Sequence, residues 1–299
     1  MTALPAPLAT LAHDPTVTDI LVNNGVEVWV ERVGHLQRVD DLASGLIDAH
    51  LERLLAPLGR RLDRLSPMVD ARLDDGTRVC AVIAPIAVGG TCVAFRLFRP
   101  DVHALDDFGV DERVWQLLVE PRGNLLVSGA TGSGKTSLVA SLLEHRPVDE
   151  RLVIIEDTHE LPVRTRHAVR LEARPANAEG RGHVGLDDLL RTALRLRPDR
   201  IIVGEVRGPE ALTLVQAMNT GHVGSMSTVH ANSAVEALER IDLLVSQAAP
   251  NWRLDDVRRL VSRAFGTVVH LVRRPDGRRV IDHVIEVHHR DERVHENVA

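Results

Sequence analysis

Cysteine, lysine and aromatic residues are all scarce in this chain of 299 residues. Its two cysteines, Cys80 and Cys92, could face each other across a hairpin, but in a chain with no visible export signal we expect buried, reduced thiols. Four Phe, three Trp and no Tyr leave few rings on which nucleic-acid bases could stack. Acidic residues outnumber basic ones by 42 to 36, so no direct nucleic-acid partner is expected.

Long apolar segments are also missing. The longest run without a charged residue lies between Arg78 and Arg96, and it is interrupted by Pro85, Gly89 and Gly90. It therefore falls short of the ~20 apolar residues that a transmembrane helix requires. The N-terminus has neither a basic start nor a continuous apolar stretch, which argues against a secretory signal. The composition, 44% hydrophobic and 26% charged, is typical of a globular protein, and we expect a cytoplasmic location.

Apolar patterning divides the chain into two parts. The first, residues 1–99, shows the patterns of short alternating strands, one helix and a strand pair, which predict a small α+β domain. These patterns lie at residues 16–40, 42–65, 77–84 and 91–98. The polar segment of residues 100–110 is expected to be a linker.

The second part, residues 111–299, alternates apolar runs with helical patterns. This alternation predicts crossover units on a mostly parallel sheet, so the fold class is α/β with a smaller α+β N-terminal domain. Strands are expected at residues 125–128, 152–155, 169–171, 201–203, 225–229, 267–273 and 279–287. Helices are expected at residues 135–144, 187–196, 209–219, 233–247 and 253–264. The end of the chain, residues 288–296, is expected to be frayed.

One glycine-rich segment, residues 129–136, matches the phosphate-loop pattern G-x-x-x-x-G-K-[ST] between a predicted strand and a predicted helix. Its glycines let backbone N–H groups turn toward phosphate oxygens, and the helix N-terminus adds its positive dipole end. Lys135, the only lysine of the chain, is expected to reach the β and γ phosphates of ATP, and Thr136 to offer a hydroxyl to Mg²⁺. The expected nucleotide contacts are Gly129, Ala130, Thr131, Gly132, Ser133, Gly134, Lys135, Thr136 and Ser137.

Two groups of acidic residues follow predicted strands in the same domain. Glu205 comes shortly after one strand, where it could reach the water shell of a metal or the attacking water; the alternative is a surface glutamate that caps the next helix. Glu156, Asp157 and Glu160 follow another strand, and a solvated acidic loop is the alternative there. Because open α/β sheets bind ligands at the carboxyl ends of their strands, these carboxylates are candidates for the nucleotide site.

Together these segments resemble the type II/type IV secretion ATPase family. Four motifs match in the right order between Gly129 and Arg240: the phosphate loop, the acidic box IEDTHEL, the modified Walker B segment RLRPDRIIVGEVRG, and the histidine box from Gly221 to Asn232. Residues 14–32 resemble the family's N-terminal domain, so the similarity covers nearly the whole chain. It is greatest to the tight-adherence (Tad/Flp) pilus assembly ATPase branch, whose members often carry an extra N-terminal region that we do not expect here.

The resemblance implies a RecA-like C-terminal domain and a role for each matching residue of its motifs. Lys135 and Thr136 would bind phosphate and Mg²⁺. Glu160 and Glu205 would activate water and position the metal, with Glu205 on the metal side together with Thr136. The acidic box also includes Glu156 and Asp157 among the expected nucleotide contacts.

The resemblance further assigns residues that respond to the γ-phosphate. His222 and His230 would couple the phosphate state to subunit contacts; a metal site is a poor alternative because two histidines without further ligands rarely suffice. Arg78 and Arg96 of the N-terminal domain would swing toward the γ-phosphate, the alternative being solvated strand residues. The family's Arg-Lys pair departs here, since Leu97 follows Arg96.

The expected function is an ATP-hydrolysing motor of a secretion or Tad/Flp-type pilus assembly system. The resemblance implies a homo-oligomer, a ring of six, that acts on an inner-membrane platform protein from the cytoplasmic face. Two alternatives remain at this stage: a nucleotide-binding scaffold with little turnover, and a RecA-like nucleic-acid motor.

Overall fold

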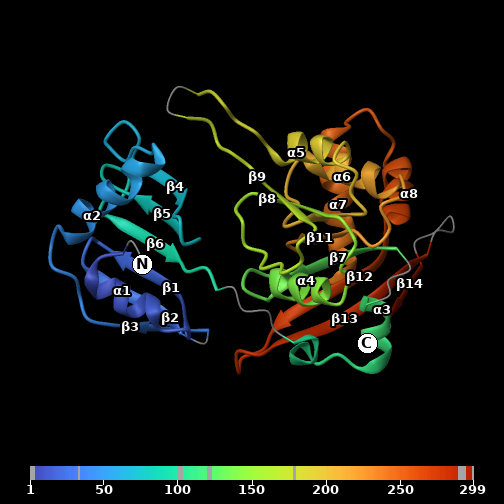
Figure 1. Cartoon of the computed structure of the whole chain (residues 1–299), viewed down its shortest axis with the longest axis horizontal. Helices are drawn as coiled ribbons and strands as arrows, with labels where there is room; N and C mark the ends of the chain where they lie inside the picture. Colours follow the sequence, from blue (N-terminus) through green and yellow to red (C-terminus); the bar gives the residue numbers. More distant parts are fainter. Residues whose placement is uncertain are drawn as a thin grey trace. The chain divides into compact units, whose positions relative to one another are not determined.

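The computed structural model describes residues 4–32, 34–99, 104–119, 123–177, 180–288 and 294–297. The chain divides into two compact units, which Figure 1 colours along the sequence. Unit 1 comprises Met1–Pro100 and Ala176–His183, and unit 2 comprises Asp101–Pro175 and Val184–Ala299. None of the described helices is long and apolar enough to cross a membrane.

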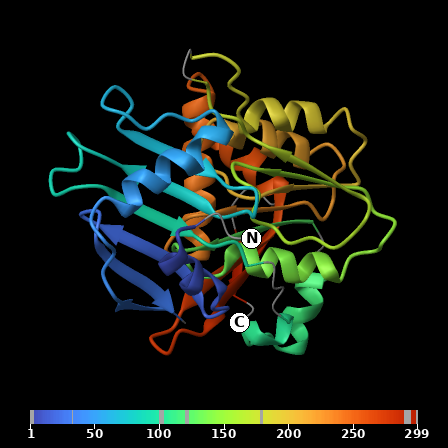
Figure 2. The same ribbon diagram turned by 60° about the vertical axis from the view of Figure 1, so that its left-hand side comes forward.

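Unit 1 is built on a six-stranded antiparallel sheet in the order β3-β2-β1-β6-β5-β4. One face of this sheet is covered by α2 (Leu46–Leu55), which Figure 2 shows lying across the strands. Alternate strand residues such as Ile20 and Val28 meet Ile47 and Leu51 of α2 in one buried core. The other elements are α1 (Ala6–His13), β1 (Val17–Asn23), β2 (Glu27–Arg32), β3 (His35–Arg38), η1 (Ala56–Leu58), β4 (Met68–Arg72), β5 (Arg78–Val82) and β6 (Cys92–Arg96).

The strands and the helix expected in this unit are present, and two further elements were not predicted. Helix α1 has prolines at its start, which in a sequence favour a turn, and it buries only Leu8 and Ala12. Strand β4 alternates buried Val69 and Ala71 with three residues that are exposed or half-buried, Met68, Asp70 and Arg72, but it is only five residues long. Both elements owe their stability to packing on the sheet rather than to a strong local pattern.

The two cysteines lie on neighbouring strands of unit 1. Both are free thiols, but the expectation that both are buried is wrong, because Cys80 is exposed and Cys92 is half-buried. The alternation of the strands explains this difference: Val79, Ala81 and Val93 face the core, so the residues next to them face outward.

Unit 2 contains an eight-stranded sheet in the order β14-β13-β12-β7-β11-β10-β8-β9. The six strands from β12 to β9 are parallel, as the alternation of strands and helices predicts, and β13 and β14 continue the sheet antiparallel. The strands are β7 (Asn124–Gly129), β8 (Leu152–Glu156), β9 (Ala168–Glu172), β10 (Arg200–Val203), β11 (Met226–Val229), β12 (Phe265–Arg273) and β13 (Arg279–His288).

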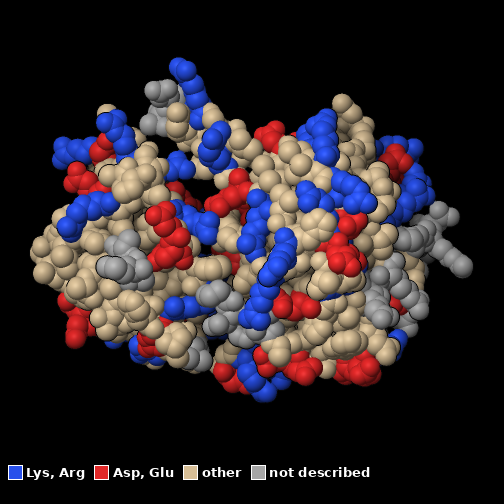
Figure 3. Space-filling model, in the orientation of Figure 1, with Lys and Arg blue, Asp and Glu red and all other residues tan. Residues whose placement is uncertain are grey.

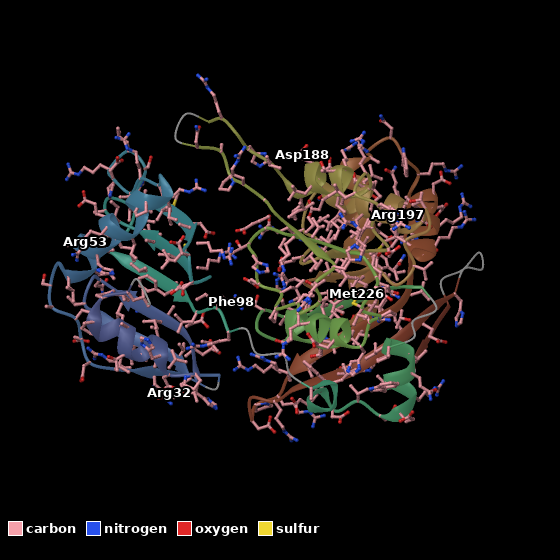
Figure 4. All side chains as sticks on the ribbon, viewed as in Figure 1. Arg32, Arg53, Phe98, Asp188, Arg197 and Met226 are labelled. Carbon is pink, nitrogen blue, oxygen red and sulfur yellow. The ribbon has the colours of Figure 1, made fainter. Side chains whose placement is uncertain are left out.

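Helices cover both faces of this sheet. One core joins the strands to α5 (Leu186–Ala193), α6 (Glu210–Met218), α7 (Ala234–Ala248) and α8 (Leu254–Ala264). The core on the other face joins them to α3 (Glu112–Val119) and α4 (Lys135–Glu144). Met226 of β11, labelled in Figure 4, is fully buried in this second core. Outside the cores, basic and acidic side chains are interspersed over the face seen in Figure 3.

Two segments of unit 2 differ from the sequence-based expectation. Residues 100–103 of the expected linker lie outside the described residues, but its later part forms the 3-10 helix η2 (Leu105–Phe108), which buries Leu105 and Phe108 in the core of α3 and α4. The chain end that we expected to be frayed contributes β14 (Val294–Asn297), which pairs with β13. Residues 289–293 lie outside the described residues.

A buried asparagine holds three segments together at the start of β7. The Nδ2 group of Asn124 donates to the carbonyls of Met218 at 3.2 Å and Ala264 at 2.7 Å, the last residues of α6 and α8. Its Oδ1 atom accepts from the N–H of Ser225, just before β11, at 3.0 Å. The amide thereby pairs backbone groups that the ends of these elements leave without a partner.

We predict that Asn124→Ala lowers the free energy of unfolding by roughly 3 kcal/mol or more, because it leaves buried backbone groups unpaired. Urea unfolding of the full chain measures the change. The exposed Asn251 provides the matched control, and Asn251→Ala should stay within about 0.5 kcal/mol of the wild type. Equal stability of the two variants would contradict the clamp role of Asn124.

Candidate active site

Five parallel strands of unit 2 end at the same edge of the sheet. They are β12, β7, β11, β10 and β8, hydrogen-bonded in that order. The phosphate loop follows β7, Glu205 follows β10, His230 follows β11, and the acidic segment begins with Glu156 at the end of β8. The topology thus brings four sequence-distant motifs to the edge where open α/β sheets bind ligands.

The phosphate loop joins β7 to α4 through backbone conformations that favour glycine. Gly132 and Gly134 have φ angles of 73° and 97°, which a side chain would strain. Lys135, the first residue of α4, is only 7% exposed. Its Nζ donates to the carbonyls of Gly129 and Ala130, both at 2.9 Å. A buried ammonium requires such partners, and the loop itself supplies them.

The residues of the loop fit a phosphate group. Ser133 is 1% exposed, and its Oγ has no hydrogen-bond partner among the described residues. A buried hydroxyl of this kind is rare unless a ligand or water completes it. Thr136 and Ser137 lie partly exposed in the first turn of α4, where backbone N–H groups are available to an anion. A magnesium-bound phosphate chain therefore suits the loop chemically.

A histidine connects the loop lysine to a carboxylate. Nδ1 of His230 lies 3.2 Å from Nζ of Lys135, and its Nε2 lies 3.3 Å from Oε2 of Glu205. His230 and Glu205 are 44% and 33% exposed, so a ligand or solvent can reach both. The chain Lys135–His230–Glu205 is the central contact of the site, and it joins three of the motifs that the sequence analysis selected.

In the acidic box, Glu156 and Asp157 hold neighbouring segments in place, and Glu160 is the candidate for catalysis. Oε1 of Glu156 accepts from the backbone N–H groups of Glu160 and Leu161, both at 2.9 Å, and its Oε2 lies 3.0 Å from Nδ1 of His159. Glu156 therefore fixes the loop that carries Glu160. Asp157 forms an ion pair with Arg207, beyond the end of β10, and thereby links the acidic box to the Walker B segment.

Burial of Glu156 explains the glycine that precedes Glu205. A Cβ atom on Gly204 would stand only 3.0 Å from Cγ of Glu156, so a larger residue would displace the buried carboxylate. Desolvation raises the pKa of Glu156 above its ordinary value, against the lowering effects of its backbone hydrogen bonds and of His159.

His222 does not join this cluster. It precedes β11, whereas His230 follows it, so His222 lies at the amino ends of the parallel strands and His230 at their carboxyl ends. Nδ1 of His222 lies 3.1 Å from the carbonyl oxygen of Ala217 near the end of α6. The motif that holds both histidines thus contributes only His230 to the edge with the phosphate loop.

The two arginines selected in unit 1 are cross-strand neighbours. Arg78 on β5 lies opposite Arg96 on β6, and Arg78 binds Asp70 through both carboxylate oxygens, at 3.2 and 2.9 Å. On the other side of Arg96, Asp19 is its register partner on β1. Burial raises the pKa of Asp19, while the charge of Arg96 acts in the opposite direction.

Sequence reasoning missed three arginines that the topology places beside these candidates. Arg72 on β4 lies opposite Arg78 and extends the arginine row of unit 1. In unit 2, Arg273 and Arg279 of the β12–β13 hairpin lie against Gly132 and Gly134 of the phosphate loop. The only signal in the sequence was the density of arginines around residues 273–279, which does not reveal that β12 pairs with β7.

We predict that Glu156→Gln removes a pH dependence of stability. Because the folded carboxyl binds its proton more tightly than the unfolded one, its contribution is full below pH 4.5 and is lost as the pH rises through the raised pKa. The variant should therefore gain stability relative to the wild type between pH 4.5 and neutrality. Urea unfolding across this range measures the difference in the free energy of unfolding between the variant and the wild type. The same pair is compared in a His159→Gln background, because His159 contacts Glu156. A difference that does not change with pH would refute the prediction.

Comparison with known proteins identifies the family. Residues 3–297 match the family described as Type II/IV secretion system protein. The chain is 39% identical over 289 residues to a putative conjugal transfer protein of Mycobacterium tuberculosis, covering 90% of this chain and 80% of that protein. It is 33% identical over 314 residues to the type IV secretion system protein PtlH of Bordetella pertussis, covering 92% and 91%.

Solved structures agree with this match. The VirB11 ATPase from the Brucella suis type IV secretion system, in complex with sulphate, is 26% identical with a TM-score of 0.51, covering 94% of this chain and 92% of that one. The pilus retraction motor PilT with bound ADP has a TM-score of 0.68 at 23% identity, covering 92% and 80%, and supports the fold alone. From its motifs, its α/β fold and these relatives, the chain belongs to the type II/IV secretion system protein family.

Proposed function

We propose that this protein is an ATP-hydrolysing motor of a type IV secretion system or a related pilus assembly system. The observation that carries the proposal is the contact chain from Lys135 through His230 to Glu205 at the carboxyl edge of the sheet. The ammonium of Lys135 and the partly exposed carboxylate of Glu205 lie on either side of one imidazole, which supports a shared ligand for both. The VirB11 relative from Brucella suis is an ATPase, which supports the same activity here.

The residues of unit 2 divide the proposed reaction between them. Backbone N–H groups of the loop and Lys135 bind the β and γ phosphates, and Mg²⁺, held on the side of Thr136 and Glu205, would neutralise charge on the phosphate chain. Glu205 accepts a hydrogen bond from the attacking water, and Glu160 is a second carboxylate for the same purpose. When Lys135 turns to phosphate, its contact with His230 changes, so His230 can report the phosphate state to its neighbours.

Unit 1 and the assembly complete the proposal. Arg78 and Arg96 supply permanent positive charge toward the γ-phosphate, for which the guanidinium fork is well shaped. We extend the proposal to a ring of six subunits at the cytoplasmic face of the inner membrane, acting on a platform protein there. The resemblance of the motifs to the Tad/Flp branch supports a pilus assembly role, whereas the relatives are named as a putative conjugal transfer protein and a type IV secretion system protein.

We predict that Lys135→Ala abolishes both tight ATP binding and turnover, because the phosphate chain loses its charge partner.

Glu205→Gln should retain ATP binding but lose at least 100-fold in kcat, roughly the size expected for a group acting in the transition state. Phosphate release and equilibrium binding of ATP by the purified chain separate the two effects. Glu239 on α7 is exposed, and Glu239→Gln is the matched control, with kcat expected at the wild-type value.

If Glu205→Gln turns over ATP within about twofold of wild type, Glu205 has no catalytic role. A wild-type chain that binds ATP without releasing phosphate would favour the scaffold alternative.

We predict that specific activity rises with protein concentration, because the arginines of unit 1 act fully only in the assembled ring. Arg96→Ala should lower kcat by more than about tenfold with a smaller effect on ATP affinity. Arg53→Ala, on the exposed surface of α2 and labelled in Figure 4, is the matched control. Light scattering beside the ATPase assay tests this prediction; full activity of a monomer at every concentration would overturn the ring.

A further inference from the structure

A histidine outside the four sequence motifs is buried beside the start of the phosphate loop. His270 on β12 is only 4% exposed. Its Nδ1 atom lies 3.0 Å from Oγ of Ser128, the residue just before Gly129. Ser128 is fully buried as well. Two buried polar side chains that meet at this point are a specific contact between the loop and a neighbouring strand.

The sheet order creates this contact. Strand β12 pairs with β7 in parallel, and Figure 1 shows the two strands next to each other. His270 is the register partner of Ser128, and Leu271 is the register partner of Gly129. Val268, two residues before His270, belongs to the core on the side of α7, so the histidine ring lies on that face of the sheet.

The hydroxyl of Ser128 bonds to two groups of β12. It donates to the carbonyl oxygen of Val269 at 3.2 Å. Because a hydroxyl has one proton and two lone pairs, its oxygen can at the same time accept a hydrogen bond from Nδ1–H of His270. Side-chain hydrogen bonds therefore reinforce the backbone pairing of β7 with β12 at the residue where the strand passes into the loop.

The ring of His270 acts by hydrogen bonding rather than by charge. Desolvation lowers its pKa below the ordinary value of 6.5, and the nearby charge of Lys135 acts in the same direction, whereas Asp282 opposes it. At neutral pH the imidazole is therefore uncharged. It holds Ser128 without adding a second cation beside the lysine.

The next residue, Gly129, lies between β12 and the rest of the loop. Its carbonyl oxygen accepts from Nζ of Lys135 at 2.9 Å. A Cβ atom on Gly129 would collide with the carbonyl oxygen of Leu271 on one side and with Oγ of Ser133 on the other. The position of this glycine therefore determines where the lysine ammonium and the buried serine hydroxyl lie.

We propose that His270 is a positioning residue of the phosphate loop: by holding Ser128, it keeps Gly129 and Lys135 in the arrangement that binds a phosphate chain. This inference rests on the proposed nucleotide site. A loop that is already ordered has less conformational freedom to lose when the nucleotide binds. Loss of the histidine contact therefore weakens nucleotide binding, although His270 itself acts only through Ser128.

Variants that remove or restore this one hydrogen bond test the inference. His270→Leu keeps a bulky buried side chain without a donor, Ser128→Ala removes the hydroxyl, and the double variant removes both. In His270→Asn the amide Nδ2 can donate from the position of Nδ1. Val268→Ala is the matched control, because it removes buried carbon from the same strand opposite Leu126, before the loop begins. Calorimetry with ADP and Mg²⁺ gives the affinities, and urea unfolding gives the stability of each variant.

We expect His270→Leu and Ser128→Ala each to weaken ADP binding about fivefold, the effect of one lost hydrogen bond. The double variant should be no weaker than the single ones by more than about twofold, because the two side chains share that bond. His270→Asn should bind ADP within about twofold of the wild type. Val268→Ala should be less stable than the wild type but bind ADP equally well.

A purely structural role of His270 gives a different result. His270→Leu and Ser128→Ala would then change stability and leave ADP affinity at the wild-type value, as Val268→Ala does, and the inference would be overturned while the nucleotide site stands. His270→Asn binding as weakly as His270→Leu, or losses that multiply in the double variant, would also contradict it. A wild type that binds no ADP overturns the nucleotide site itself. If His270→Leu fails to fold, Ser128→Ala and His270→Asn carry the test.

Discussion

The burial of one ammonium group governs the arrangement of the site. Lys135 is almost fully enclosed, and a buried cation is stable only with polar partners. The carbonyls of Gly129 and Ala130 and the ring of His230 provide them. His230 directly follows β11, and its ring also contacts Glu205, which follows β10. The position of the Lys135 ammonium is therefore coupled to the ends of two neighbouring strands. Any anion that attracts Lys135 therefore acts on the whole edge of the sheet.

Much of the fold could be predicted from the sequence, because its local patterns are strong. Most parallel strands of unit 2 are largely apolar runs between helices, apart from the edge strand β9, and the structure confirms them within a few residues. The exceptions have weak patterns: α1 starts among prolines, and the short strand β4 buries only two of its residues. The exposed thiol of Cys80 could not be predicted from the missing export signal, which bears on the redox state of a thiol; its exposure follows from the alternation of β5, because one face of the sheet is solvated.

The site could be predicted only where a motif carries its own geometry. The phosphate loop is such a motif, since one segment provides both the turn and the lysine. The histidine box is not, because a single strand separates His222 from His230 and takes them to opposite edges. The arginines of the β12–β13 hairpin depend on which strand is adjacent to β7, and strand order is not encoded in any local pattern. Glu156 illustrates a further limit, since its support of the Glu160 loop depends on burial.

The central claim is that Lys135, His230 and Glu205 act as one unit, and a double-mutant cycle tests it most directly. We would measure kcat for ATP hydrolysis in the wild type, His230→Gln, Glu205→Gln and the double variant. Residues that act together are strongly non-additive, so the account predicts that the double variant loses about as much kcat as Glu205→Gln alone. Losses that multiply, so that the two changes add in free energy, would show that the contact has no functional coupling and would contradict the account.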